Sequence, residues 1–215
     1  MIGLEWNFYL LYEVIMETIN NEKESLIKDI IQLEWEMFSS VVASEPNSCQ
    51  EDRKTFQVMR WMSYSAFDEK LLKSFFENLK QAKEDERNLM TEKYGKMEGI
   101  IPHLEESADI ERIADAEVKW MKEVSEKYPL TFPRDNAENA DKKFNNYLKC
   151  ELETYSEVTL SLYADLVKKS LDAGNNLVEE RYNNLFMKMG YKSLADKESQ
   201  EKHKEFWDKN TNKGC

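Results

Sequence analysis

Apolar residues recur every three or four positions along most of the chain, which is the spacing of one face of an α-helix. Alternation of apolar and polar residues, which would indicate strands, forms no comparable run. The pattern predicts an all-α protein, a compact bundle of six to eight helices. The helices are expected at residues 4–19, 22–43, 49–66, 68–98, 107–127, 136–173, 175–189 and 194–209. Those at 22–43, 49–66 and 136–173 should form the centre.

Capping residues support several of these boundaries. Ser48 and Glu51 have the spacing of a capping box, in which each side chain bonds the other residue's backbone N–H. Asn176 and Glu179 repeat that spacing, and Gly174 just before them is a typical helix terminator. Both places are therefore expected to begin a new helix.

The composition agrees with a helical core. Hydrophobic residues make up 41% of the chain, whereas Gly (6) and Pro (4), which interrupt helices, are scarce. No Gly/Ser-rich linker divides the sequence. We expect one helical domain over residues 1–209 and a frayed tail over 210–215.

Charge and cysteine usage narrow the partners and the compartment. A formal charge of −12 opposes nucleic-acid binding and contact with anionic membranes, both of which need basic surfaces. The apolar stretch at residues 1–19 carries several Glu residues, so it indicates neither a signal peptide nor a membrane helix. Three cysteines without a CxxC spacing favour a reducing compartment. We expect a cytoplasmic protein that binds neither nucleic acid nor membrane.

Two glutamates fall on apolar helix faces. Each residue turns a helix by about 100°, which places Glu34 within the stripe of helix 22–43 and Glu151 within that of helix 136–173. By the same rule Glu36 and Glu153 point away from those stripes. A buried carboxylate must be paired, protonated or bound to a metal. A polar site inside the bundle is therefore expected.

Two interpretations of this site remain open. In one, Glu34 and Glu151 belong to a structural network with Arg60, Lys93, Tyr94 or Tyr155. In the other, they line a pocket for a small polar molecule, where a Glu of raised pKa acts as acid or base and Arg60 pairs an anionic group. The candidates are Glu34, Glu151 and Cys49 as catalytic residues and Asp52, Arg60, Tyr94 and Tyr155 as substrate-binding residues.

The available chemistry is limited. The two histidines belong to no Glu-x-x-His or HExxH pair, and no nucleotide, haem or zinc signature is present. A carboxylate site would favour Mg²⁺ or Mn²⁺, because oxygen ligands dominate. Cys49 lies in the first turn of an expected helix, whose dipole lowers a thiol pKa, but Glu51 and Asp52 oppose that effect.

Four motifs carry a family resemblance. They are Leu33-Glu-Trp-Glu-Met-Phe38, Cys49-Gln-x-Asp52 with Thr55-Phe-x-x-Met-Arg60, Lys93-Tyr94-x-x-Met97, and Glu151-Leu-x-Thr-Tyr-Ser156. Together they resemble a bacterial family of unknown function over residues 22–195, with a departure between Val42 and Ser48. The resemblance implies a compact helical domain, in some relatives joined to a nucleotidyltransferase-like domain.

Two function classes follow. The first is a small-molecule-binding or enzymatic pocket lined by the buried carboxylates, Arg60 and Tyr155. The alternative is a non-catalytic partner or regulatory domain, with a nucleotidyltransferase-like protein as the partner that the resemblance implies. The acidic surface and the missing catalytic signatures favour the alternative, whereas two acids facing one Arg favour the pocket.

Overall fold

The computed structural model describes residues 22–41, 52–103, 107–133 and 137–211. Within these residues the chain forms nine helices and no strand, which confirms the all-α class but exceeds the six to eight helices expected. In chain order these are α2 (Glu22–Ser39), α3 (Arg53–Ser65), α4 (Glu69–Glu84), α5 (Leu89–Met97), α6 (Ala108–Lys127), α7 (Ala137–Leu152), α8 (Glu157–Asp172), α9 (Leu177–Lys188) and α10 (Leu194–Thr211).

The expected helix at 68–98 is two helices, α4 and α5. Glu86 between them has a φ of 54°, a left-handed conformation that ends a helix. Asn88 then caps α5, because its side-chain oxygen accepts a hydrogen bond from the Thr91 N–H at 2.9 Å. A side chain that bonds local backbone in this way competes with helix continuation.

The expected helix at 136–173 is also two helices, α7 and α8. Ser156 adopts extended backbone angles, and its hydroxyl accepts a hydrogen bond from the Thr159 N–H at 3.3 Å. The turn between Leu152 and Glu157 therefore changes the direction of the chain without a Gly or Pro to signal it.

The predicted start of α9 is confirmed, whereas α2 ends at Ser39, before the expected residue 43, and α3 begins at Arg53, after the expected residue 49. Asn176 caps α9 by accepting from the Glu179 N–H at 2.9 Å, and Gly174 has a φ of 69°. The helix expected at 4–19, the capping box at Ser48 and most of the expected tail lie outside the described residues.

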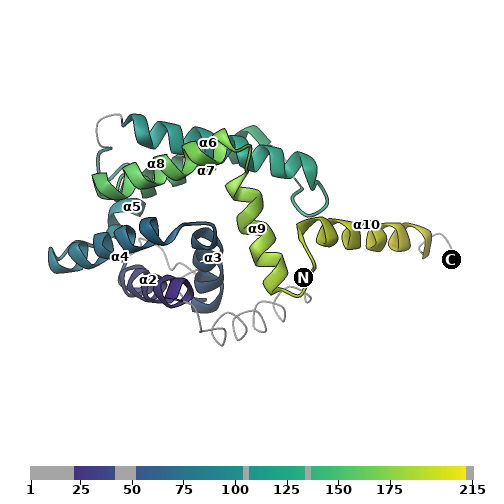
Figure 1. Ribbon diagram of the computed structural model, residues 1–215, viewed down its shortest axis with the longest axis horizontal. Coiled ribbons are helices and arrows are strands. Elements are labelled where there is room, and N and C mark those ends of the chain that lie inside the picture. Colours follow the sequence, from purple (N-terminus) through teal and green to yellow (C-terminus); the bar gives the residue numbers. More distant parts are fainter. Residues whose placement is uncertain (1–21, 42–51, 104–106, 134–136, 212–215) are drawn as a thin grey trace.

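The helices form two groups that pack on each other (Figure 1). In the first group α2 packs on α3, α4 and α5, and in the second α6 packs on α7, α8 and α9. The groups meet where α4 contacts α8, α5 contacts α7, and α3 contacts α9. α6 therefore holds the central position in the second group, although it was not among the helices expected at the centre. α10 packs on α9 and extends away from the body.

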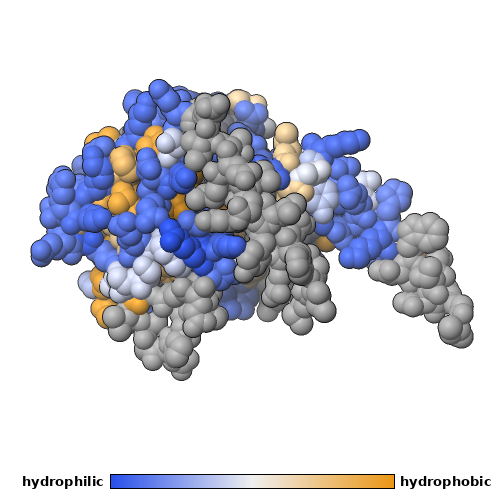
Figure 2. Space-filling model, turned by 90° about the horizontal axis from the view of Figure 1, so that it is seen from below, coloured by the Kyte–Doolittle hydropathy of each residue, from blue (hydrophilic) through white to orange (hydrophobic). Residues whose placement is uncertain are grey.

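The apolar stripes expected within residues 22–43 and 68–98 lie mostly in the core, whereas the stripe expected over residues 136–173 does not continue into α8, where Val158 is 66% exposed. Leu71, Phe75 and Leu79 of α4 are buried, as are Ile27 and Ile30 of α2. Each such side chain contributes roughly 1.5–3 kcal/mol by leaving water. On the face shown in Figure 2, hydrophilic residues cover most of the described surface. No helix among the described residues has the length and hydrophobicity needed to span a bilayer.

Asn88 joins the end of α2 to the start of α5 and gives a first prediction. Its amide donates to the Met37 carbonyl at 2.8 Å and lies 2.9 Å from the Ser40 hydroxyl. We expect Asn88→Ala to lower the free energy of unfolding by about 1–2 kcal/mol, because a helix cap and a bond between helices are both lost.

Urea denaturation measures this effect. Asn88→Asp is the matched control, since aspartate keeps the capping oxygen but not the amide donors, and it should cost less than Asn88→Ala. Equal stability of the wild type and Asn88→Ala would contradict the role of Asn88 at this junction.

Candidate functional site

Four charged side chains from four helices meet inside the bundle. They are Glu34 of α2, Arg60 of α3, Lys93 of α5 and Glu151 of α7, and we call them the charged cluster. The side chains of Glu34 and Lys93 are only 1% and 2% exposed. The helical phase that placed Glu34 and Glu151 toward the core is therefore confirmed, and Glu36 is exposed as expected and pairs with Lys83.

Arg60 bridges the two carboxylates with the two edges of its guanidinium group. The edge formed by Nε and Nη2 donates to both oxygens of Glu34, with 2.9 Å between Nε and Oε2. The edge formed by Nη1 and Nη2 donates to Glu151 at 3.1 and 3.0 Å. Bidentate Arg–carboxylate pairs are strong and geometrically specific, and Arg60 makes two of them.

Lys93 supplies the second positive charge. Its ammonium group donates to Glu151 Oε2 at 2.5 Å and lies 3.5 Å from the centre of the Tyr147 ring, a cation–π contact. The charged cluster thus contains two carboxylates and two cations, so its formal charges cancel.

Tyrosine hydroxyls complete the bonding of the carboxylates. Tyr64 donates to Glu34 Oε1 at 2.6 Å, and Tyr155 lies 3.4 Å from Glu151 Oε1. Tyr94 is at the edge, with its ring centre 5.5 Å from the Lys93 ammonium nitrogen. Tyr64 had no polar role in the sequence interpretation, although its position four residues after Arg60 on one helix could have indicated the contact.

The pKa values of the two buried carboxyl groups are shifted in opposite directions. Burial raises the pKa of Glu34, and neighbouring Arg60 offsets this only in part. Burial acts on Glu151 too, but Arg60 and Lys93 together outweigh it and hold the pKa of Glu151 far below its usual range. Burial alone would lower the pKa of Lys93, whereas its contact with Glu151 raises it. Glu151 is therefore ionised at neutral pH. As the pH falls, Glu34 is the first of the two acids to take up a proton.

Little space remains beside these groups. The cavity that the cluster lines with Met37, Phe75, Leu79 and their neighbours has a volume of about 10 Å³. That volume holds roughly one water molecule, which the surrounding polar atoms could bond. A small organic molecule does not fit there.

The remaining predicted site residues lie elsewhere. Asp52 is exposed and caps α3, accepting from the Thr55 N–H at 3.0 Å and from its hydroxyl at 2.6 Å, bonds that lower the Asp52 pKa. Cys49 lies outside the described residues. Among the described residues no three His, Cys, Asp or Glu side chains gather in a group that could hold a metal ion. Arg60 lies between Glu34 and Glu151, where a bridging Mg²⁺ or Mn²⁺ would have to bind.

Glu153, which helical phase placed outside the apolar stripe, is not left to solvent. Its carboxylate is nearly buried and bonds Lys96 at 2.7 Å and His103 Nδ1 at 2.8 Å. The helical phase of α7 does not apply to this residue, because α7 ends at Leu152.

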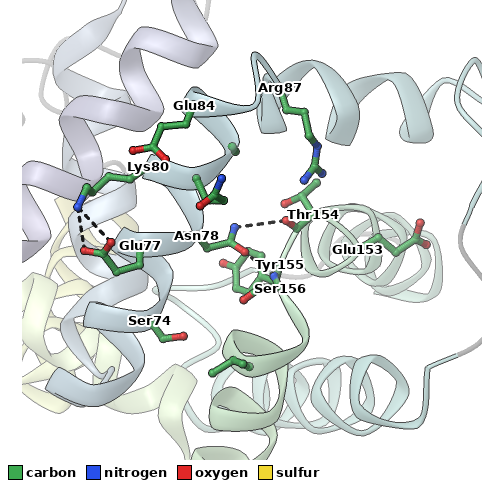
Figure 3. A pocket seen from close by; sticks show the side chains of 13 residues that line it. Ser74, Glu77, Asn78, Lys80, Glu84, Arg87, Glu153, Thr154, Tyr155 and Ser156 are labelled. Carbon is green, nitrogen blue, oxygen red and sulfur yellow. Dashed lines mark hydrogen bonds and ion pairs between the residues drawn. The ribbon is translucent and has the colours of Figure 1, made fainter.

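A larger opening lies next to the charged cluster, between α4 and the turn that joins α7 to α8 (Figure 3). This α4–α8 groove has a volume of about 560 Å³, and among its lining residues are Ser74, Asn78, Arg87, Thr154, Tyr155 and Ser156. Thr154 and Tyr155 line both the groove and the small cavity at the cluster. The turn is fastened to α4 by the Asn78 side chain, which accepts from the Ser156 N–H at 2.5 Å. Sequence reasoning missed this groove.

Comparison with known proteins identifies the family. No curated protein and no solved structure matches the chain. The family model described as "Protein of unknown function (DUF4125)" matches residues 24–199, which include the charged cluster and the α4–α8 groove. The chain therefore belongs to this family of unknown function, as the resemblance of its sequence had predicted.

Proposed function

We propose that the protein is a non-catalytic binding domain, in which the charged cluster holds the helices in register and recognition takes place at the surface. The observation that carries this proposal is the matching of two buried carboxylates by two buried cations beside a cavity of about 10 Å³. Every charge of the cluster has a partner of opposite sign, and a substrate has no room to reach it. Such buried polar groups specify the arrangement of helices in some proteins.

One observation favours a second function, an acid–base site at Glu34. The pKa of Glu34 is raised while that of Glu151 is lowered. Two neighbouring acids whose pKa values differ in this way are a common feature of catalytic sites. In that function Glu34 would exchange a proton with a molecule that enters beside Tyr155. The two functions differ in what the removal of the Glu34 charge does to stability.

Thermal melting of Glu34→Gln separates them. If the cluster is structural, the variant should lose about 1–2 kcal/mol, because Arg60 and Tyr64 face an amide in place of a carboxylate. For a chain of this length that corresponds to a melting temperature lower by about 2–8 °C. Added Mg²⁺ or Mn²⁺ should leave the melting temperatures of wild type and variant unchanged.

Glu36→Gln is the matched control, since Glu36 lies on the same helix and is exposed. It should change the melting temperature by less than about 2 °C, as expected for a surface ion pair. An unchanged or raised melting temperature of Glu34→Gln, or a stabilisation of the wild type by Mn²⁺, would reject the structural role and favour the acid–base site.

A further inference from the structure

The α4–α8 groove has the size of a small-molecule site. Its volume of about 560 Å³ falls within the range of roughly 300–1,000 Å³ that such sites occupy. It offers both polar and apolar contacts, since Asn78 and Ser74 lie along its α4 wall and Val158, a strongly exposed hydrophobic side chain, lies on its α8 side.

Arg87 lines this groove, and one edge of its guanidinium group is only partly used by described residues. Its Nε and Nη2 atoms donate to the two oxygens of Glu92 at 2.8 and 2.7 Å, which fixes the orientation of the side chain. Its Nη1 atom has no partner among the described residues. Figure 3 shows the end of the Arg87 guanidinium directed toward Thr154, on the opposite wall of the groove.

Arg60 shows what such an edge binds in this fold. The Nε–Nη2 edge of Arg60 holds one carboxylate, and its Nη1–Nη2 edge holds a second. Arg87 holds Glu92 with the equivalent Nε–Nη2 edge, and its side chain lines the groove with the end of the guanidinium directed toward Thr154. We propose that the α4–α8 groove binds a small organic molecule that carries a single carboxylate, with the free edge of Arg87 as the anchor.

The charges of the residues that line the groove limit the ligand to one negative charge. Three acidic residues (Glu77, Glu84, Glu153) and two basic residues (Lys80, Arg87) line the groove. Lys80 pairs with Glu77 at 3.1 Å and Lys96 pairs with Glu153 at 2.7 Å, whereas Glu84 has no ion pair among the described residues. A dianion such as phosphate would meet this excess of negative charge, and a carboxylate meets it only half as strongly.

The rest of the ligand is polar with a short hydrocarbon part. Asn78 uses one amide hydrogen in a long bond of 3.4 Å to the Thr154 carbonyl, so it can also donate to a ligand. The Ser74 hydroxyl can rotate to serve a ligand amide or hydroxyl group, and Val158 contributes an apolar contact. An N-acylated amino acid has this combination of groups.

Titration followed by ¹H–¹⁵N spectra tests the site at low ionic strength, where the ion pair is least screened. The probe is N-acetyl-L-alanine, and the neutral N-acetyl-L-alaninamide is its matched control. We expect saturable shifts of the Arg87 Nε–H, the Asn78 side-chain amide and the backbone amides of residues 153–158 with the carboxylate only. Arg87→Gln should weaken binding at least about tenfold, the loss of one charge-assisted pair.

Two further variants sharpen the result. Glu92→Gln should tighten binding by about two- to threefold, since Arg87 then shares its charge with no protein carboxylate. Arg112→Gln should leave binding unchanged, because Arg112 is as exposed as Arg87 (50% each) and also pairs with an acid, but lies on α6 and does not line the groove.

Three outcomes would overturn the site: equal binding of the neutral amide, saturation by inorganic phosphate at lower concentration than by the carboxylate, or unchanged binding to Arg87→Gln. The inference rests on the proposed binding function, but the experiments test the two independently. Melting of Glu34→Gln tests the charged cluster without any ligand, and the titration tests the groove without disturbing the cluster.

Discussion

Glu151→Gln is expected to lower the free energy of unfolding by about 3–5 kcal/mol. Glu151 is the carboxylate that both cations share, accepting from Arg60 and from Lys93. With glutamine in its place Arg60 keeps Glu34, but the ammonium group of Lys93, 2% exposed, stays buried without a carboxylate. Urea denaturation at neutral pH measures the loss.

A double-mutant cycle with Lys93→Met assigns this loss to the pair. Each single change leaves a buried charge behind, whereas the double change removes both charges at once. We expect the double variant to be more stable than the sum of the two single losses predicts, by roughly 1–3 kcal/mol. Additive losses would show that Glu151 and Lys93 do not act on each other.

The pH dependence should distinguish the two acids. The pKa of Glu151 is lowered by folding, so its contribution is fully present above the unfolded value of about 4.3 and is lost as the pH falls below it. The pKa of Glu34 is raised, so its contribution is present below about 4.3 and is lost as the pH rises through the folded pKa. The cost of Glu151→Gln should therefore shrink on acidification, while that of Glu34→Gln should grow.

The burial of Glu34 and Glu151 could be predicted because it depends on helical phase alone. Within one unbroken helix the direction of a side chain follows from its position relative to apolar neighbours, and α2 and α7 are unbroken up to these residues. The rule no longer applies at Glu153, which lies one residue beyond the end of α7 and is nearly buried. A helix boundary placed wrongly shifts the expected direction of every later side chain.

The partners of these residues were harder to predict. Two acids facing one arginine favoured a pocket in the sequence interpretation, in which Lys93 was only one of several candidate partners. The chain turns at Glu86 and starts again at Leu89, and the new helix α5 directs Lys93 toward Glu151 of α7. The packing between helices decides which helices face each other. The periodicity within a single helix does not contain this information.

The α4–α8 groove depends even more on tertiary structure. Its walls come from residues 74–87 and 153–158, which are distant in sequence. Residues 80–93 are rich in Glu and Lys, a composition typical of an exposed face, and most of them are exposed although Lys93 is buried. The orientation of Arg87 comes from its bond to Glu92 after the turn, a contact that the assumption of a continuous helix does not allow.

A second buried ion pair gives the other large effect, at the junction of α6 and α9. Arg181→Met is expected to lower the free energy of unfolding by about 3–5 kcal/mol. Arg181 donates to Glu117 Oε1, and the Tyr163 hydroxyl donates to the same oxygen at 2.8 Å. Glu117 is 1% exposed, and its other oxygen has no hydrogen-bond partner among the described residues. Without Arg181 this carboxylate would keep a single neutral donor and would have to be hydrated or protonated inside the core.

Urea denaturation of three variants separates the charge from the packing. Glu117→Gln/Arg181→Met should recover part of the loss of Arg181→Met, because no charge is then left in the core. Tyr163→Phe removes one neutral donor and should cost only about 1–2 kcal/mol. The pair anchors α9, which α10 packs against, so amide exchange of α9 and α10 should accelerate in Arg181→Met more than exchange of α4. Uniform acceleration would mean that the pair stabilises the whole bundle and gives α9 no separate anchor.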